Sequence, residues 1–229
     1  MKIGIISDIH SNIFALDSVI ESGISNGVQK WYCLGDISGY YYWPSECINL
    51  LRELSVKCIA GNHDKYLCDK YKTRNDLKER TGGDIRIALD TLSDDQFSWL
   101  CTLPNKLKIS VDGHKVLLCH GSPWDLNYYL YPDATYEVRS RIERTDVDIV
   151  FFGHTHYPII WDDLNVLSVN PGSVGQPRDR SPGACWAIWD TRENNISLKR
   201  EIYDLKNIIQ ACKKYDPNDK YLQDVLTRE

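Results

Sequence analysis

The sequence predicts an α/β fold, and two observations lead to this class. Short apolar runs alternate along the 229 residues with segments whose apolar side chains recur at helical spacing. Five of these apolar runs are followed directly by side chains that can bind a metal ion, as expected where the strands of an open α/β sheet end at a ligand site. Because no internal repeat, low-complexity segment or linker interrupts the chain, we expect a single domain over residues 1–229.

The first half of the chain is expected to contain three strands with helices between them. The runs KIGIIS, KWYCL and VKCIA have the length and apolar character of buried strands. Helices are predicted over Ile13–Ser25, which has one apolar face, and over residues 44–54, which have a proline in the first turn. The charge-rich sequence over residues 64–102 is expected to be helical and is a candidate cap over the site.

The second half is expected to be richer in strands. The runs KLKISV and KVLLC flank Asp112 and Gly113, a dipeptide typical of hairpin turns. A helix is predicted over residues 136–145, and DIVFF is expected to form another buried strand. The C-terminal part adds predicted strands near residues 164–169, 184–189 and 196–202, followed by a helix over residues 205–214.

Composition narrows the class of protein. The net charge of -5 gives no basic footprint for nucleic acid over the whole chain, although a local basic patch stays open. The eight cysteines include no C-x-x-C pair, so we expect reduced, buried thiols rather than zinc ligands or disulfides. Since the N-terminus lacks the apolar stretch of a signal peptide and no run of about 18 apolar residues occurs, we expect a cytoplasmic protein with no membrane partner.

The polar residues that follow the five apolar runs are the strongest functional signal. They are Asp8 and His10, Asp36, Asn62 and His63, His120, and His154 with His156. Five of the six histidines of the chain lie in these places, which a scatter of surface histidines would not produce. In an extended chain His154 and His156 point the same way, with Cα atoms about 6–7 Å apart. That spacing suits two ligands that each bind a different ion of a metal pair.

The ordered motifs D-x-H, G-D, G-N-H-D, H-G and G-H-T-H resemble those of the calcineurin-like metallophosphoesterase superfamily. The resemblance extends from Asp8 to about Gly175, and the flanking sequences GDISGY and NPGSVG are similar to the small prokaryotic branch of phosphodiesterases and phosphatases. It implies a β-sandwich of two mixed sheets flanked by helices, a fold that the strand pattern allows but does not itself show.

The resemblance also implies two metal sites. Asp8, His10 and His156 would hold one ion, whereas Asn62, His120 and His154 would hold the other. Asp36 would bridge the two ions. Oxygen and nitrogen donors without a thiolate suit Mn²⁺, which we favour, with Fe, Zn²⁺, Ni²⁺ or Mg²⁺ as alternatives.

The chemistry implied is hydrolysis of phosphodiesters or phosphomonoesters by a metal-bridging hydroxide. By resemblance His63 faces the substrate and either protonates the leaving group or stabilises charge; its alternative is a structural histidine that orients the turn. Asn12 either hydrogen-bonds to a metal ligand or is the N-cap of the helix that starts at Ile13.

The substrate is left open by the sequence. Aromatic residues replace the aspartate and arginine that follow G-D in protein Ser/Thr phosphatases, which argues against a phosphoprotein substrate. The aromatic run that begins at Tyr40 either stacks a nucleobase or packs on the following helix, and the aromatic residues after HGSPWD could form another wall. Arg178 and Arg180 are candidate phosphate contacts or solvated loop residues. A small phosphoester, with a nucleotide as one candidate, is the expected partner; nucleic acid is not excluded, and the oligomeric state is not indicated. The alternative to an enzyme is a non-catalytic scaffold on this fold, as in the retromer subunit that resembles these enzymes.

Overall fold

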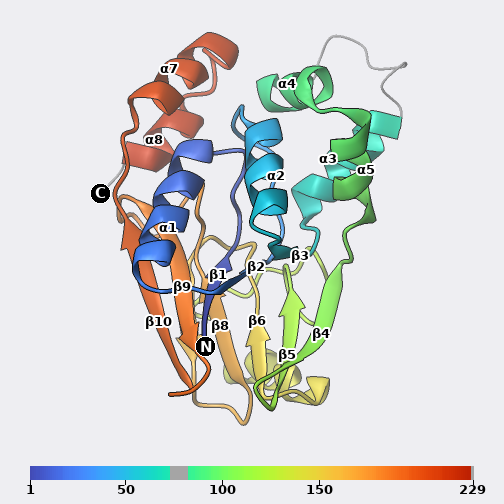
Figure 1. Cartoon of the computed structure of the whole chain (residues 1–229), viewed down its shortest axis with the longest axis vertical. Coiled ribbons are helices and arrows are strands. Elements are labelled where there is room, and N and C mark those ends of the chain that lie inside the picture. Colours follow the sequence, from blue (N-terminus) through green and yellow to red (C-terminus); the bar gives the residue numbers. More distant parts are fainter. Residues whose placement is uncertain (73–81, 228–229) are drawn as a thin grey trace.

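Two five-stranded sheets pack face to face and helices flank them, which confirms the predicted sandwich (Figure 1). The computed structural model describes residues 1–72 and 82–227. Within this part of the chain, no helix combines the length and the apolar character that crossing a bilayer requires.

The first sheet has the strand order β10-β9-β1-β2-β3. Its strands are β1 (Lys2–Ile6), β2 (Lys30–Cys33), β3 (Lys57–Cys58), β9 (Ala184–Asp190) and β10 (Asn195–Glu201). The three N-terminal strands are parallel, whereas β9 runs antiparallel to β1 and β10 antiparallel to β9. The carboxyl ends of β1, β2 and β3 therefore lie at one edge of the sheet.

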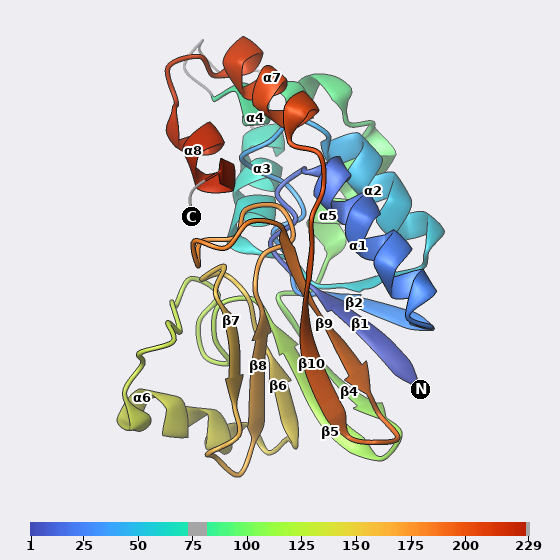
Figure 2. The same ribbon diagram turned by 90° about the vertical axis from the view of Figure 1, so that its left-hand side faces the viewer.

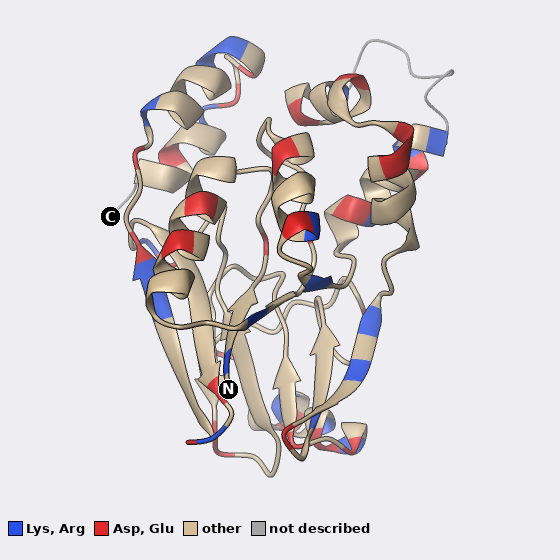
Figure 3. Cartoon of the chain, in the orientation of Figure 1, with Lys and Arg blue, Asp and Glu red and all other residues tan. Residues whose placement is uncertain are grey.

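The second sheet has the order β4-β5-β6-β8-β7. Its strands are β4 (Lys106–Val111), β5 (His114–Cys119), β6 (Ile149–Phe151), β7 (Pro158–Trp161) and β8 (Leu167–Pro171). β4 and β5 form the predicted hairpin, and β5, β6 and β8 are parallel. Exposed lysines occupy the edge strand β4 (Figure 3), which discourages pairing with another chain.

Side chains that alternate along the strands fill the space between the sheets. Ile3 and Ile5 of β1 meet Ile149 and Phe151 of β6 in one apolar cluster, together with the fully buried Trp189 of β9. The intervening residues point to the outer faces, where helices cover them. Burial on both faces explains why these strands appear in the sequence as continuous apolar runs rather than as alternating ones.

Most helices lie on the outer face of the first sheet (Figure 2). They are α1 (Ile13–Ser25), α2 (Pro44–Glu53), α3 (Asn62–Lys72), α4 (Gly83–Thr91) and α5 (Asp94–Thr102). The short helix α6 (Tyr136–Ser140), continued by a 3-10 turn over Arg141–Thr145, covers the second sheet. α7 (Lys206–Tyr215) and α8 (Tyr221–Thr227) pack on Tyr41 and Tyr42.

The segment 64–102 is helical where the structure describes it, as expected, whereas two other elements were not expected. The segment 64–102 contains three helices that pack on the core; its role as a cap stays a prediction, and residues 73–81 lie outside the described residues. The strand β7 was not expected, because it has only four residues and the first is a proline. The helix α8 was missed because seven residues with mixed polarity give too short a periodic signal.

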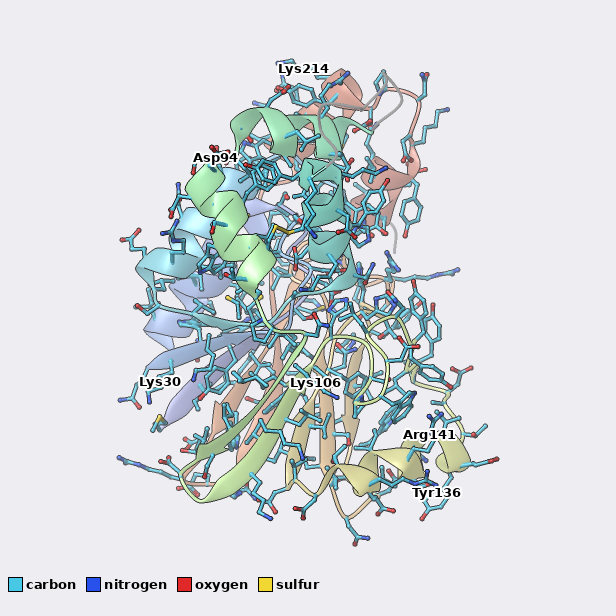
Figure 4. The ribbon with its side chains drawn as sticks, turned by 90° about the vertical axis from the view of Figure 1, so that its right-hand side faces the viewer. Lys30, Asp94, Lys106, Tyr136, Arg141 and Lys214 are labelled. Atoms are coloured by element: carbon cyan, nitrogen blue, oxygen red, sulfur yellow. A yellow bond between two sulfur atoms is a disulfide. The ribbon has the colours of Figure 1, made fainter. Side chains whose placement is uncertain are left out.

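The expectation that no cysteine is paired was wrong for two of the eight. Cys68 of α3 and Cys101 of α5 form a disulfide that joins the two helices (Figure 4). The spacing gave no sign of it, because 33 residues separate the partners and only the packing of α3 on α5 brings them together. The other six cysteines are buried thiols, as expected.

We predict that the oxidised protein, unfolded without reductant, exposes six titratable thiols rather than eight. Because the bond closes a 33-residue separation, replacing both Cys68 and Cys101 by serine should lower the free energy of unfolding by about 2–4 kcal/mol in denaturant titrations. The matched control is Cys119→Ser, which removes a thiol outside the bridge. Its free energy of unfolding is compared with that of the wild type under reducing conditions, in which the bridge is open. Eight thiols in the oxidised sample would show that the bond does not form.

Candidate metal centre and catalytic site

Loops from both sheets bring the predicted ligands to one edge of the sandwich. Asp8 and His10 follow β1, Asp36 follows β2 and Asn62 follows β3, all in the first sheet. The loops are joined to each other by main-chain bonds: Asp8 N donates to Gly35 O at 3.0 Å and His10 N to Asp36 O at 2.9 Å. From the second sheet, His120 follows β5, whereas His154 and His156 follow β6; Gly153 N donates to His120 O at 2.7 Å.

One group of ligand atoms belongs to Asp8, His10 and His156. All lie within 4.8 Å of one another, and all three residues are buried. The Nε2 atoms of His10 and His156 are 3.0 Å apart, and His156 Nε2 is 3.3 Å from Asp8 Oδ1. This is the set that the family resemblance implied for the first ion.

A second group contains Asp36, His120 and His154, again within 4.8 Å. Asn62 joins it, since its Oδ1 lies 3.0 Å from His120 Nε2, and Asp36 Oδ2 is 3.3 Å from the same nitrogen. Asp36 Oδ2 is also 3.9 Å from His10 Nε2, so this carboxylate reaches both groups. The structure therefore brings together all seven residues that the sequence proposed as ligands.

Hydrogen bonds on the far side of three rings fix which nitrogen faces the site. His10 Nδ1 donates to Ser38 O at 3.1 Å, His156 Nδ1 to Gln176 O at 2.6 Å and His120 Nδ1 to Leu34 O at 2.8 Å. A carbonyl oxygen only accepts, so in each neutral ring Nε2 carries a lone pair. The lone pairs of His10 and His156 then face each other across 3.0 Å with no proton between them.

Such an arrangement is unfavourable unless a cation occupies it. Asp8 Oδ1 and His154 Nε2 are buried and have no hydrogen-bond partner in the described part of the chain. Buried polar atoms without partners are uncommon and destabilising. The residues present therefore fit divalent metal ions, for which neutral imidazoles and carboxylates are good donors.

The charges of Asp8 and His154 agree with this fit. Burial alone would raise the pKa of Asp8, but His156, His120 and His10 outweigh it and hold that pKa well below its usual range, so the carboxylate is ionised. Burial, followed by the charge of His120, lowers the pKa of His154 to about 4. His120 differs, because Asp36 and Asp8 outweigh the effect of burial and raise its pKa to about 9.

Five of the seven ligand residues have a strained backbone conformation. Asp8, His10, Asp36, His154 and His156 all have positive φ, and they are five of twelve such non-glycine residues among the described ones. The assumption that the chain is extended through the two C-terminal histidines was wrong: β6 ends at Phe151, and φ is 68° at His154 and 63° at His156. The histidines still reach different groups, but two left-handed turns, not strand alternation, direct them there.

Two glycines allow the loops to approach this closely. A Cβ on Gly61 would overlap Asp36 Oδ1, and a Cβ on Gly153 would overlap the Ser7 hydroxyl. At both places the absent side chain lets the main chain lie against a residue of the site.

Asp64 is a structural residue that the sequence analysis did not single out, although it completes the G-N-H-D motif. It is fully buried and accepts bonds from Ile37 N at 3.3 Å, Ser38 N at 2.9 Å and Gly61 N at 2.9 Å. Ser38 in turn offers its carbonyl to His10. Asp64 therefore holds the second and third ligand loops together and orients a ligand through Ser38.

His63 lies between the metal ligands and a cleft of about 490 Å³. Its backbone N donates to Asp36 Oδ1 at 2.8 Å, and its ring lies edge-on to that of His10, with centroids 5.0 Å apart. A ring nitrogen of His63 is within 4.8 Å of ligand atoms of His10 and Asp36, closer to the ligands than the sequence indicated. The cleft wall also includes Tyr66 and Asp84.

The proposed substrate contacts divide into two sets. Tyr40 packs against His10 and His63, with centroid distances of 4.5 Å and 4.7 Å, and Arg178 Nη2 donates to the Tyr40 hydroxyl at 3.2 Å. Arg180 is exposed and has no ion pair or hydrogen bond within the described residues.

The contacts of Asn12 and of the aromatic run decide between the alternatives that the sequence left open. Asn12 is the N-cap of α1, accepting from Ala15 N at 3.2 Å, and its amide donates to Gly175 O at 2.9 Å rather than to a ligand side chain. The remaining members of the aromatic run, residues 41–43, pack on α1 and the C-terminal helices.

The sequence model of the calcineurin-like phosphoesterase superfamily domain matches residues 1–194. The chain belongs to this superfamily. The seven ligand positions lie within the matched region, whereas β10, α7 and α8 lie beyond it.

Relatives of the superfamily resemble most of the chain. The uncharacterised protein MJ0912 of Methanocaldococcus jannaschii is 32% identical over 233 residues, covering 93% of this chain and 92% of that protein. The phosphodiesterase YfcE of Escherichia coli K12 is 21% identical over 192 residues, covering 80% of this chain and 85% of YfcE. The crystal structure of a metallophosphoesterase from Sphaerobacter thermophilus has a TM-score of 0.83 at 27% identity, covering 100% of this chain and 98% of that one. The chain is therefore a phosphoesterase-family protein with the family fold.

We predict that Asp64→Ala destabilises the protein strongly, because it leaves three buried backbone N–H groups unpaired at about 1–3 kcal/mol each. Denaturant unfolding of the metal-free protein should show a loss of about 3 kcal/mol or more. Asp69→Ala, at an exposed position of the same helix, should change stability by less than about 0.5 kcal/mol. A small, equal effect of Asp64→Ala and Asp69→Ala on the free energy of unfolding would refute the role of Asp64 in holding the two ligand loops together.

Proposed function

We propose that this protein is a binuclear metal-dependent phosphoesterase that hydrolyses phosphodiesters, phosphomonoesters or both. One observation carries the proposal: the Nε2 lone pairs of His10 and His156 face each other at 3.0 Å. A second group of potential metal ligands lies beside this pair, and Asp36 reaches both groups. A bound metal ion makes this cluster of acceptors favourable. Membership of the phosphoesterase superfamily supports the reaction class.

In this proposal Asp8, His10 and His156 hold one ion, Asn62, His120 and His154 the other, and Asp36 bridges them. Two divalent ions, when bound, neutralise phosphoryl oxygens and acidify water at neutral pH. The donor set favours Mn²⁺, with Fe, Zn²⁺, Ni²⁺ or Mg²⁺ as alternatives. The carbonyls of Ser38, Gln176 and Leu34 keep the rings in the ligating tautomer and orientation.

The chain's own contribution to the reaction comes from the cleft side of the ligands. His63 lines the cleft and would give a proton to the leaving oxygen, since its ring lies next to His10 and its backbone is tied to Asp36. Arg178 would contact a phosphoryl oxygen; its Nη2 bonds to Tyr40 and Gln176, and its Nε has no partner within the described residues. Arg180 is the weaker candidate because it is exposed and has no hydrogen bond or ion pair within the part of the chain that the structure describes.

A non-catalytic scaffold on the same fold is the competing proposal. A scaffold has no need of a complete ligand set with unpaired buried acceptors, or of a histidine placed between that set and a cleft. Both features are present here, so we favour the enzyme. A small phosphoester, a nucleotide among the candidates, and a cytoplasmic location belong to the same proposal.

We predict that the protein hydrolyses bis(p-nitrophenyl) phosphate and loses this activity on chelation, with recovery on adding Mn²⁺. Elemental analysis should find about two ions per chain in the wild type and about one in His156→Ala. Asp36→Asn should retain fewer than His156→Ala, because a bridging carboxylate serves both ions. Full metal content in both variants would refute the ligand assignment. Metal-loaded protein that hydrolyses no phosphoester would favour the scaffold.

We predict that His63→Ala keeps its metal ions and loses far more activity on an alkyl phosphodiester than on an aryl one. An aryl ester leaves as a stabilised phenolate and needs little help, whereas an alkoxide needs a proton; general acid catalysis is typically worth about 10²–10⁴-fold. The measurement is kcat/KM for both substrates, with the metal content of each sample. Equal losses on both substrates would instead indicate stabilisation of charge, and metal loss would make His63 a ligand.

A further inference from the structure

Two half-exposed tyrosines stand beside the metal ligands, and the proposed mechanism does not use them. Tyr129 and Tyr131 are 47% and 42% exposed. The Tyr129 ring lies over that of the ligand His154, with centroids 3.9 Å apart and planes inclined by 32°. The Tyr131 ring is stacked parallel to Tyr129, at 5.5 Å and 7°. A continuous series of rings therefore leads from a metal ligand to the protein surface.

The loop that carries the two tyrosines is fixed in place. Leu130, which lies between them, is fully buried in the core cluster of the second sheet. Leu130 is buried, whereas its two neighbours Tyr129 and Tyr131 are exposed, so the buried leucine anchors the loop while both tyrosines reach solvent. Upstream, Ser122 N bonds to Asp125 O at 2.9 Å, and Tyr157 meets Tyr131 edge-on.

Other aromatic residues of the same loop pack on the core, whereas Tyr129 and Tyr131 belong to none of the apolar clusters of the described residues. Trp124 and Tyr128 pack on the core cluster of the second sheet, and the Arg141 guanidinium lies 4.0 Å from the Trp124 ring centroid. Shielding of His154 would account for Tyr129 alone, because Tyr131 stacks on Tyr129 and, within the described residues, makes no ring contact with a ligand. An ordered ring pair that faces solvent beside a reaction centre is suited to binding a flat ligand.

The proposed phosphate contact lies on the same side. Arg178 N donates to His156 O at 3.3 Å, and Tyr157, the residue after His156, meets Tyr131 edge-on. Partial burial and the neighbouring Tyr129 raise the pKa of Tyr131, and the charge of Arg178 lowers it in part. A ligand with an anionic end at the metal centre and a planar end on the rings would thus meet complementary groups at both ends.

We propose that Tyr129 and Tyr131 form a stacking platform for the base of a nucleotide phosphoester whose phosphoryl group lies at the metal centre. This inference rests on the proposed function, since the metal centre anchors the phosphoryl group. Every base has a π-face, so the platform selects nucleotides over aliphatic phosphoesters without selecting one base. Rigid rings lose little conformational freedom on binding, which favours affinity.

The test compares two ligands that differ only in the base, AMP and ribose 5-phosphate, by calorimetry on the Mn²⁺-loaded protein. The wild type should bind AMP about 5- to 150-fold more tightly than ribose 5-phosphate, the usual range for base–aromatic stacking. Tyr131→Ala should bring AMP down to the affinity of ribose 5-phosphate while leaving ribose 5-phosphate and the metal content unchanged. Tyr131→Phe should keep the difference.

Tyr136→Ala is the matched control. Tyr136 is 61% exposed and lies on α6, away from the carboxyl ends of the strands (Figure 4), so its loss should change neither affinity. Equal binding of the two ligands by the wild type, no measurable binding of AMP, or an equal loss of both ligands in Tyr131→Ala would overturn the platform. Binding does not require turnover: preference for AMP without hydrolysis of any phosphoester would contradict the enzyme and keep the platform, whereas hydrolysis with equal binding would contradict the platform alone.

Discussion

The whole site depends on one constraint: several buried acceptor atoms face one another with no hydrogen-bond donor among them. Imidazole lone pairs of His10 and His156 and the free oxygen of Asp8 occupy the same small volume. An isolated cluster of this kind would disperse, because each unsatisfied acceptor is destabilising. Here the surrounding protein holds it together, since a carbonyl oxygen fixes the ring of His10 and that of His156, and the turn after β1 fixes Asp8.

Packing within the sandwich offsets the free-energy cost of this arrangement. A residue held in a sparsely populated backbone conformation costs of order 1–3 kcal/mol, and five of the seven ligands have positive φ. Such turns persist only where packing over-determines them. The cluster between the sheets, with Phe151 and Trp189 fully buried, does so from below, and Asp64 does so from the side by bonding to both neighbouring loops.

The sequence contained most of the site and only part of the fold. Ligand identities could be predicted because strand ends and motifs are local in sequence, and the residues at those ends are chemically unusual. The division into two sheets came from the family resemblance, since an apolar run does not say which strand it pairs with. The Cys68–Cys101 bond, the bonds from Asp64 to the loop after β2 and the packing of Tyr129 on His154 depend on contacts between distant segments, and no period or spacing reveals these. The direction of His154 and His156 was inferred from the wrong backbone geometry, because left-handed residues at non-glycine positions leave no mark in the sequence.

The origin of the ligands in different sheets has a mechanical consequence. Asp8 and His10 belong to the first sheet and His156 to the second, and the other donor group is divided in the same way. An ion held by either group would therefore link the two sheets of the sandwich. Any sliding of one sheet over the other changes the distances between the ligand atoms. The apolar residues between the sheets therefore set the size of the metal centre, although they lie far from it.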